Sequence, residues 1–121
     1  MPHHGDEHWN TLPTRIALDE ESDAFFIWVP VPEVVRFQAF VDLSEGIGTV
    51  RTPQLEGRLA KLTARNKYSF LSILTTPSLR KHFLSFLQSI KDEIPWEPMT
   101  QDIFDENTWE ELESFVKLKL I

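Results

Sequence analysis

The sequence predicts an α+β domain, in which a small antiparallel sheet of about five strands packs against one long amphipathic helix and a C-terminal helix. Two observations support this prediction. Residues 68–94 read as a buried strand, a proline-containing break and an amphipathic helix in direct succession. Before that segment, short apolar or alternating runs are separated by turn-forming residues, a pattern that is typical of antiparallel strands.

Length and composition fit one domain at residues 9–121, preceded by a flexible tail at residues 1–8. The chain has 121 residues, 41% of them hydrophobic, which is enough for a core without covalent cross-links. It contains no Cys, so disulfide bonds and zinc–thiolate sites are excluded. No apolar run approaches the ~20 residues of a membrane-spanning helix. We therefore expect a soluble, cytoplasmic protein without membrane attachment.

The net charge of −7 is unevenly distributed along the chain. Residues 1–50 hold nine acids and two bases, residues 51–81 hold seven bases and one acid, and residues 82–121 hold nine acids and three bases. One interpretation is that the bases of the middle segment neutralise acids from both flanks. The other is that they form a positive face that recognises an acidic partner or a phosphate.

The N-terminal tail contains the only candidate metal ligands that the sequence suggests. His3 and His4, together with a free terminal amine, could chelate Cu(II) or Ni(II) in a square-planar arrangement. Two His beside a terminus are more typical of a mobile tail, so we expect no functional metal site.

The first half of the chain predicts three strands. Residues 14–18 and 24–29 are apolar runs on either side of an acidic cluster at residues 19–23, which predicts a hairpin with a solvated tip. We expect none of the acids in this cluster to be buried, and their spacing is not that of a calcium loop. Residues 35–43 alternate between apolar and polar side chains and predict a half-buried strand. Phe40 falls on its polar face and is a candidate anchor for a partner.

Residues 52–66 fit two structures. One is a helix that starts at Thr52 and is weakened by Gly57. The other, narrowly favoured, is a hairpin that pairs residues 58–64 with residues 68–74. In both structures four bases and a tyrosine form a candidate binding cluster for an acidic partner: Arg58, Lys61, Arg65, Lys67 and Tyr68.

The central segment predicts a strand at residues 68–74 and a helix after it. Thr76 is suited to cap this helix, and Pro77 to its first turn. His82 lies at the edge of the apolar face and is expected to be structural. The apolar face itself recurs at three- and four-residue spacing: Leu79, Phe83, Phe86, Leu87 and Ile90.

The C-terminal part predicts an extended break and a last helix. Two prolines within residues 94–98 disfavour helix there. Thr108 and Glu111 have the spacing of a capping box and predict that the last helix begins at Thr108. Trp96 and Trp109 belong either to the core or to an interface, and with Phe40 they are the candidate partner anchors.

The sequence contains none of the motifs that carry common catalytic chemistry. A P-loop, a glycine-rich dinucleotide turn, HExxH and GxSxG are all missing. The 19 acids are too many for any pair to be singled out as catalytic. We therefore expect no enzymatic activity and no cofactor.

One family resemblance runs through residues 9–93. The early hairpin IALDEESDAFFIWV and, above all, the segment SFLSILTTPSLRKHFLSFLQSI resemble the N-terminal region of a PD-(D/E)XK nuclease-like family associated with bacterial restriction and defence genes. The Asp and Glu-x-Lys residues of nuclease chemistry are missing from this chain. The resemblance therefore implies a recognition domain that does not cut DNA.

Two functions follow as hypotheses. The first is a non-enzymatic domain that binds a protein partner, as a bacterial or phage defence, anti-defence or toxin-neutralising factor would. The alternative is a nuclease-associated nucleic-acid-recognition module that uses the basic segment at residues 51–81.

Overall fold

The computed structural model describes residues 12–44 and 46–119. The strands of this part of the chain are β1 (Arg15–Ala17), β2 (Asp23–Pro30), β3 (Thr49–Arg51), β4 (Tyr68–Thr75) and β5 (Glu97–Pro98). Its α-helices are α2 (Val34–Leu43), α3 (Gly57–Thr63), α4 (Arg80–Ser89) and α5 (Glu106–Lys119). Short 3₁₀ turns precede three of these helices: Val31–Glu33, Pro77–Leu79 and Gln101–Ile103.

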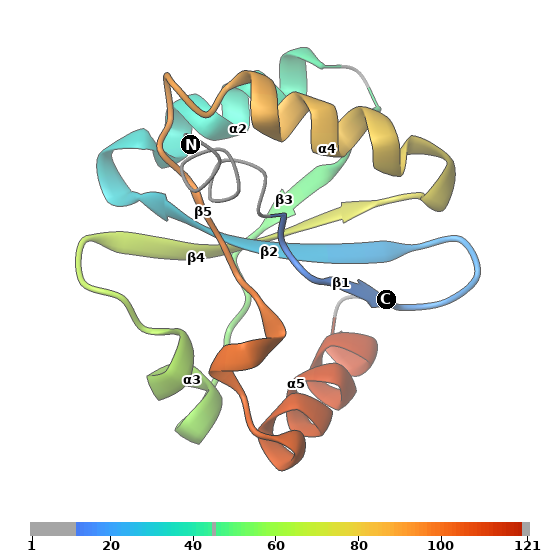
Figure 1. Ribbon diagram of the computed structural model, residues 1–121, viewed down its shortest axis with the longest axis vertical. Helices are drawn as coiled ribbons and strands as arrows, with labels where there is room; N and C mark the ends of the chain where they lie inside the picture. The colour runs from blue at the N-terminus through green and yellow to red at the C-terminus, as the bar shows by residue number, and fades with distance from the viewer. Residues whose placement is uncertain (1–11, 45, 120–121) are drawn as a thin grey trace, which may run out of the picture.

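The strands form one antiparallel sheet with helices on both faces. The strand order is β1-β2-β4-β3, and β5 also pairs with β2. Helices α2 and α4 cover one face of the sheet, and α3 and α5 cover the other (Figure 1). The predicted α+β class and antiparallel sheet are confirmed, as is the C-terminal helix.

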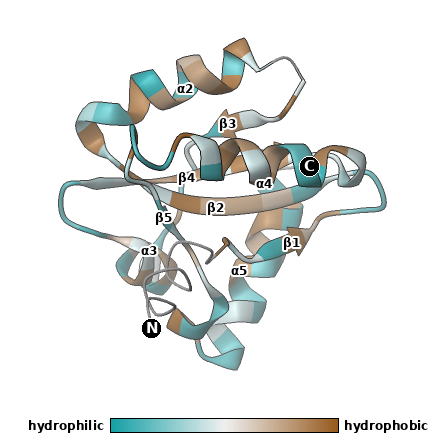
Figure 2. Ribbon diagram, turned by 45° about the horizontal axis from the view of Figure 1, so that its top comes forward, coloured by the Kyte–Doolittle hydropathy of each residue, from teal (hydrophilic) through white to brown (hydrophobic). Residues whose placement is uncertain are grey.

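Strand β2 lies between two hydrophobic cores. Phe25, Ile27 and Val29 belong to the core under α2 and α4. Phe26 and Trp28, from the alternate positions, belong to the core formed with α3 and α5. Because both faces of β2 are covered, its sequence is almost continuously apolar rather than alternating, as its colouring in Figure 2 shows.

The hairpin predicted at the start of the sheet is confirmed, but residues 35–43 are not a strand. Strand β1 pairs antiparallel with β2. Residues 34–43 form α2 instead of the predicted strand, with Phe37 and Val41 in the core. Two-residue alternation and three- to four-residue spacing overlap in this segment. Only the helical spacing agrees with the burial of this segment, because Phe37 and Val41 are buried whereas Val35 and Leu43, which a strand would place in the core, are exposed.

The narrowly favoured hairpin of residues 58–64 with residues 68–74 is also wrong. Residues 57–63 form α3, and β4 pairs with β2 and β3. Gly57 was the argument against a helix, but it lies at the helix boundary with a φ of +58°, where glycine is favourable. Strand β3, which the sequence did not predict, takes the place of the expected partner for β4.

Both C-terminal helices exist, with starts that differ from those expected. Pro77 begins a 3₁₀ turn, and α4 follows from Arg80 with Phe83 and Leu87 in the core. Helix α5 begins at Glu106, two residues before the predicted start. The Oδ1 of Asp105 accepts the amide N–H of Thr108 at 2.8 Å, and the hydroxyl of Thr108 accepts the amide N–H of Asp105 at 3.0 Å. Asp105 therefore caps the helix, and Thr108 closes the box.

Asp23 corrects the expectation that the acidic turn buries none of its carboxylates. Its side chain is 1% exposed and accepts hydrogen bonds from Arg15 at 3.1 Å and from Arg80 at 3.2 Å. Two guanidinium groups compensate the loss of hydration that burial imposes on this carboxylate. The pair of contacts links β1, β2 and α4.

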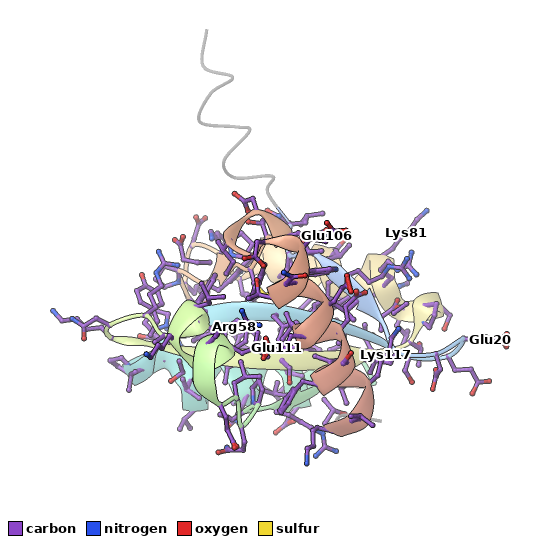
Figure 3. The ribbon with its side chains drawn as sticks, turned by 90° about the horizontal axis from the view of Figure 1, so that it is seen from below. Glu20, Arg58, Lys81, Glu106, Glu111 and Lys117 are labelled. Carbon is purple, nitrogen blue, oxygen red and sulfur yellow. The ribbon has the colours of Figure 1, made fainter. Side chains whose placement is uncertain are left out.

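Replacing Asp23 with Ala should lower the free energy of unfolding by about 2 kcal/mol, because two charge-assisted hydrogen bonds disappear. Urea unfolding measures the change. Glu20→Ala is the matched control, since Glu20 is exposed on the same turn and points away from the fold (Figure 3). Equal losses in the two variants would show that the buried carboxylate contributes nothing specific.

The cap of α5 predicts a pH effect. Hydrogen bonds from the backbone and the side chain of Thr108 lower the pKa of Asp105. A lowered pKa means that the carboxylate stabilises the fold above its ordinary pKa of about 3.9, and that this stabilisation is lost as the pH falls through the lowered value. Asp105→Ala should therefore be less stable than wild type at neutral pH, with the difference shrinking in acid. Asp105→Asn, which keeps an acceptor, should lose less; a difference independent of pH would contradict this assignment.

Candidate functional site

The predicted basic cluster is built into the fold around Arg65. The guanidinium carbon of Arg65 lies 5.2 Å from the ring centre of Trp28 and 4.8 Å from that of Tyr68. The same guanidinium pairs with Glu97 at 3.6 Å, and the indole N–H of Trp28 donates to the carbonyl of Thr63 at 2.8 Å. Arg65 therefore ties β2, β4 and β5 together at one end of the sheet.

A second base of the cluster is paired across the lower face of the molecule. The Nη2 of Arg58 on α3 lies 2.9 Å from the Oε1 of Glu111 on α5 (Figure 3). With Arg65–Glu97 and Arg80–Asp23, three of the seven bases of residues 51–81 pair with acids from the two flanking segments. For these three, the interpretation that the segment neutralises its flanks is confirmed. Lys61 and Lys67 are exposed and make no ion pair with the described residues.

Trp96 is a core residue, so its prediction as a partner anchor is wrong. It is 1% exposed, and its indole N–H donates to the carbonyl of Leu87 at 2.8 Å. The Lys91 ammonium lies 4.1 Å from the centre of its ring. Burial lowers the pKa of Lys91, and the negative charge of Glu97 offsets part of this effect. A side chain enclosed in this way cannot reach a partner.

The other two predicted anchors are half-buried. Trp109 packs on Phe104 with ring centres 5.7 Å apart. Phe40 packs against the core beneath α2, and the guanidinium carbon of Arg36 lies 5.5 Å from its ring centre. Each ring is therefore committed to an intramolecular contact on one side.

The outward face of α2 carries an apolar surface that the sequence did not predict. Val31 is 55% exposed, Val35 78% and Leu43 79%. Val31 belongs to the 3₁₀ turn before α2. Within α2, Val35, exposed Ala39 and Leu43 recur every four residues, which brings their side chains to one side of the helix. We call Val31, Val35, Ala39 and Leu43 the α2 stripe. The strand prediction concealed it by assigning Val35 and Leu43 to the core.

The charges around the α2 stripe are mainly acidic. Glu33 lies before the first turn of α2, and Asp42 is exposed near its end. The one nearby base on the helix, Arg36, is already engaged with Glu33 at 3.3 Å and with Glu93 at 3.4 Å. Three acids, Glu33, Asp42 and Glu93, thus outnumber the one base, and we call this net negative surround of the stripe its acidic rim.

The described residues contain neither a cluster of metal ligands nor a helix that could span a membrane. No three His, Cys, Asp or Glu side chains in this part of the chain gather closely enough to hold a metal ion. His3 and His4 lie outside the described residues. His82 is exposed on α4. No helix of the described part combines the length and apolarity needed to cross a bilayer.

The chain matches no protein-family model, no curated protein and no solved structure to which it was compared.

The pairing of the basic segment predicts a result for nucleic acid. Because Arg58 and Arg65 are held by Glu111 and Glu97, we expect no saturable binding of labelled single-stranded or double-stranded DNA at low ionic strength, measured by fluorescence anisotropy. Saturable binding that weakens steeply with salt and is lost in the Lys61→Ala, Lys67→Ala double variant would contradict this expectation. That result would support the nucleic-acid alternative.

Proposed function

We propose that this chain is a non-enzymatic protein-interaction domain that docks through the α2 stripe onto a protein with an apolar patch and a basic rim. The observation that carries the proposal is the exposure of Val35 and Leu43, at 78% and 79%, on a helix whose opposite side is fully committed to the core. Exposed apolar side chains are common singly, whereas their recurrence along one side of a helix favours an interface.

The helix supports this role because its position is fixed. Phe37 and Val41 are buried on its inner side, and Phe37 packs on Phe86 of α4 with ring centres 6.5 Å apart. Arg36 adds a polar link from α2 to the segment after α4. A rigid helix loses little conformational freedom when a partner binds, which favours affinity.

Charge indicates what kind of partner fits. The chain carries a net charge of −7, and the rim of the stripe is acidic. Opposite charge accelerates association and disfavours wrong partners, so a basic rim suits the partner better than a second copy of this acidic chain. As the setting for this activity we propose bacterial or phage defence, anti-defence or toxin neutralisation, by the resemblance of residues 9–93 to a nuclease-associated family.

The first experiment captures the native protein from its own cell extract, with and without nuclease treatment, and identifies what co-purifies. The partner is then purified, and its affinity is measured for wild type, Val35→Asp and Leu43→Asp. We expect roughly 10- to 100-fold weaker binding for each variant, because a charge replaces a desolvated apolar contact.

Leu118→Asp is the matched control, since Leu118 on α5 is 80% exposed and lies away from the stripe. It should bind as wild type does, and all three variants should unfold at the wild-type urea midpoint. Binding of the partner that survives both α2 substitutions would refute the stripe as the docking surface. Loss of every partner on nuclease treatment would instead favour nucleic-acid recognition.

A further inference from the structure

We propose that the outer edge of β3, with the pocket beside it, binds an acidic extended peptide by strand addition. This site is distinct from the α2 stripe. Helix α2 covers one face of the sheet and α5 the other (Figure 1). The pocket is lined by the end of β3, the chain that follows it and the end of α5.

Strand β3 has a free backbone edge within the described part of the chain. It pairs with β4 in the register Thr49↔Leu74, Val50↔Ile73 and Arg51↔Ser72. On the far side of the sheet, β1 and β5 together complete the edge of β2. Strand β3 ends the strand order, so its outer edge has no strand partner among the described residues and offers a position where an extended peptide could add.

The pocket supplies a place for an apolar side chain of that strand. It encloses about 770 Å³, and half-buried Leu55 and Phe115, which pack against the core below the sheet, contribute its apolar lining. This volume lies within the range of sites that hold small ligands, about 300–1,000 Å³, so it leaves room for one large side chain of a peptide. Pro53, also in the lining, stiffens the chain that borders the pocket.

The charges of the pocket select an anionic ligand. Arg51 and Lys119 line it and are exposed, and neither forms an ion pair with a described residue. Glu56 is the one acid among the lining residues. Two bases against one acid leave the pocket lining net positive in a chain of net charge −7, and this local charge complements Asp or Glu side chains.

The strand period fixes the pattern that the peptide needs. Val50 packs toward the core under α2 and α4, so Thr49 and Arg51 lie on the opposite side of β3, where Arg51 lines the pocket. Alternate residues of an added strand share that side. The geometry therefore favours a segment in which a bulky apolar residue has an acid two positions before it and two positions after it.

The probe is a fluorescent peptide with blocked ends and the sequence Ser-Glu-Ser-Phe-Ser-Glu-Ser. We expect saturable binding with a dissociation constant below about 1 mM, with amide NMR shifts concentrated at Thr49–Arg51 and around Leu55 and Phe115. Two peptides serve as controls, one with Lys for Glu and one with Pro for the two inner Ser residues and an N-methyl group on Phe, which together remove the central donors that face either edge of the added strand. Both should fail to bind, the first by charge and the second because its central residues cannot donate backbone hydrogen bonds.

Charge reversal in the protein tests the same contacts. The Arg51→Glu, Lys119→Glu double variant should bind the acidic peptide roughly tenfold or more weakly and should gain binding of the Lys peptide. Lys117→Glu is the matched control, because Lys117 is an exposed base on the same end of α5 that does not line the pocket.

Failure of this proposal is distinguishable from failure of the α2 proposal. Leu43→Asp should bind the peptide as wild type does, and the charge-reversal variant should still bind the α2 partner. No saturable binding, equal binding of the Lys or Pro peptides, or NMR shifts centred on α2 would each overturn strand addition at β3.

Discussion

Strand β2 imposes the constraint on which the rest of the structure depends, because its apolar residues point to both sides of the sheet. Phe25, Ile27 and Val29 require a cover on one face, while Phe26 and Trp28 require one on the other. Helices α2 and α4 cover the first face, and helices α3 and α5 cover the second (Figure 1). Both proposed binding surfaces arise from these covers. The α2 stripe is the outward side of one covering helix, and the pocket beside β3 forms where the end of α5 meets the chain that leads to α3.

Buried polar groups of this apolar frame form hydrogen bonds within the fold, and these bonds help to orient the helices that cover the sheet. Asp23 receives two guanidinium groups, and the buried indole N–H groups of Trp28 and Trp96 donate to the carbonyls of Thr63 and Leu87. Arg80, Thr63 and Leu87 lie on covering helices, so a misplaced helix would leave a buried polar atom without one of its hydrogen bonds. Arg58 and Arg65 are likewise engaged in ion pairs, with Glu111 and Glu97. The segment with the most positive sequence is consequently less positive as a surface.

Sequence alone predicted the elements whose patterns have a single solution. The apolar run of β4 and the helical spacing of α4 are of this kind, as is the hairpin of β1 and β2. It failed at α2, where Val35 and Leu43 satisfy a two-residue period while Phe37 and Val41 satisfy both periods. The need of β2 for a cover decides between them. Because the strand prediction placed Val35 and Leu43 in the core, the α2 stripe was not predicted. For the basic cluster, the sequence identified the bases, but their partners lie 53 residues away for Arg58 and in β5 for Arg65, and no local pattern reveals such pairs.

The pairing of β2 with β5 also bears on how the chain folds. Ile27 lies opposite Pro98, and the core below the sheet unites Ile16 near the start of the described chain with Val116 near its end. Contacts that span so much sequence carry a large loop-closure entropy, and they slow folding relative to a helical bundle of equal length. Neither core can be completed by a nascent chain that lacks its last third, because Trp96 belongs to one and Leu112 to the other. During synthesis, therefore, the apolar strand β2 lacks core contacts on both faces until these C-terminal residues have emerged. In that interval its apolar side chains are exposed, and the chain is most prone to aggregate.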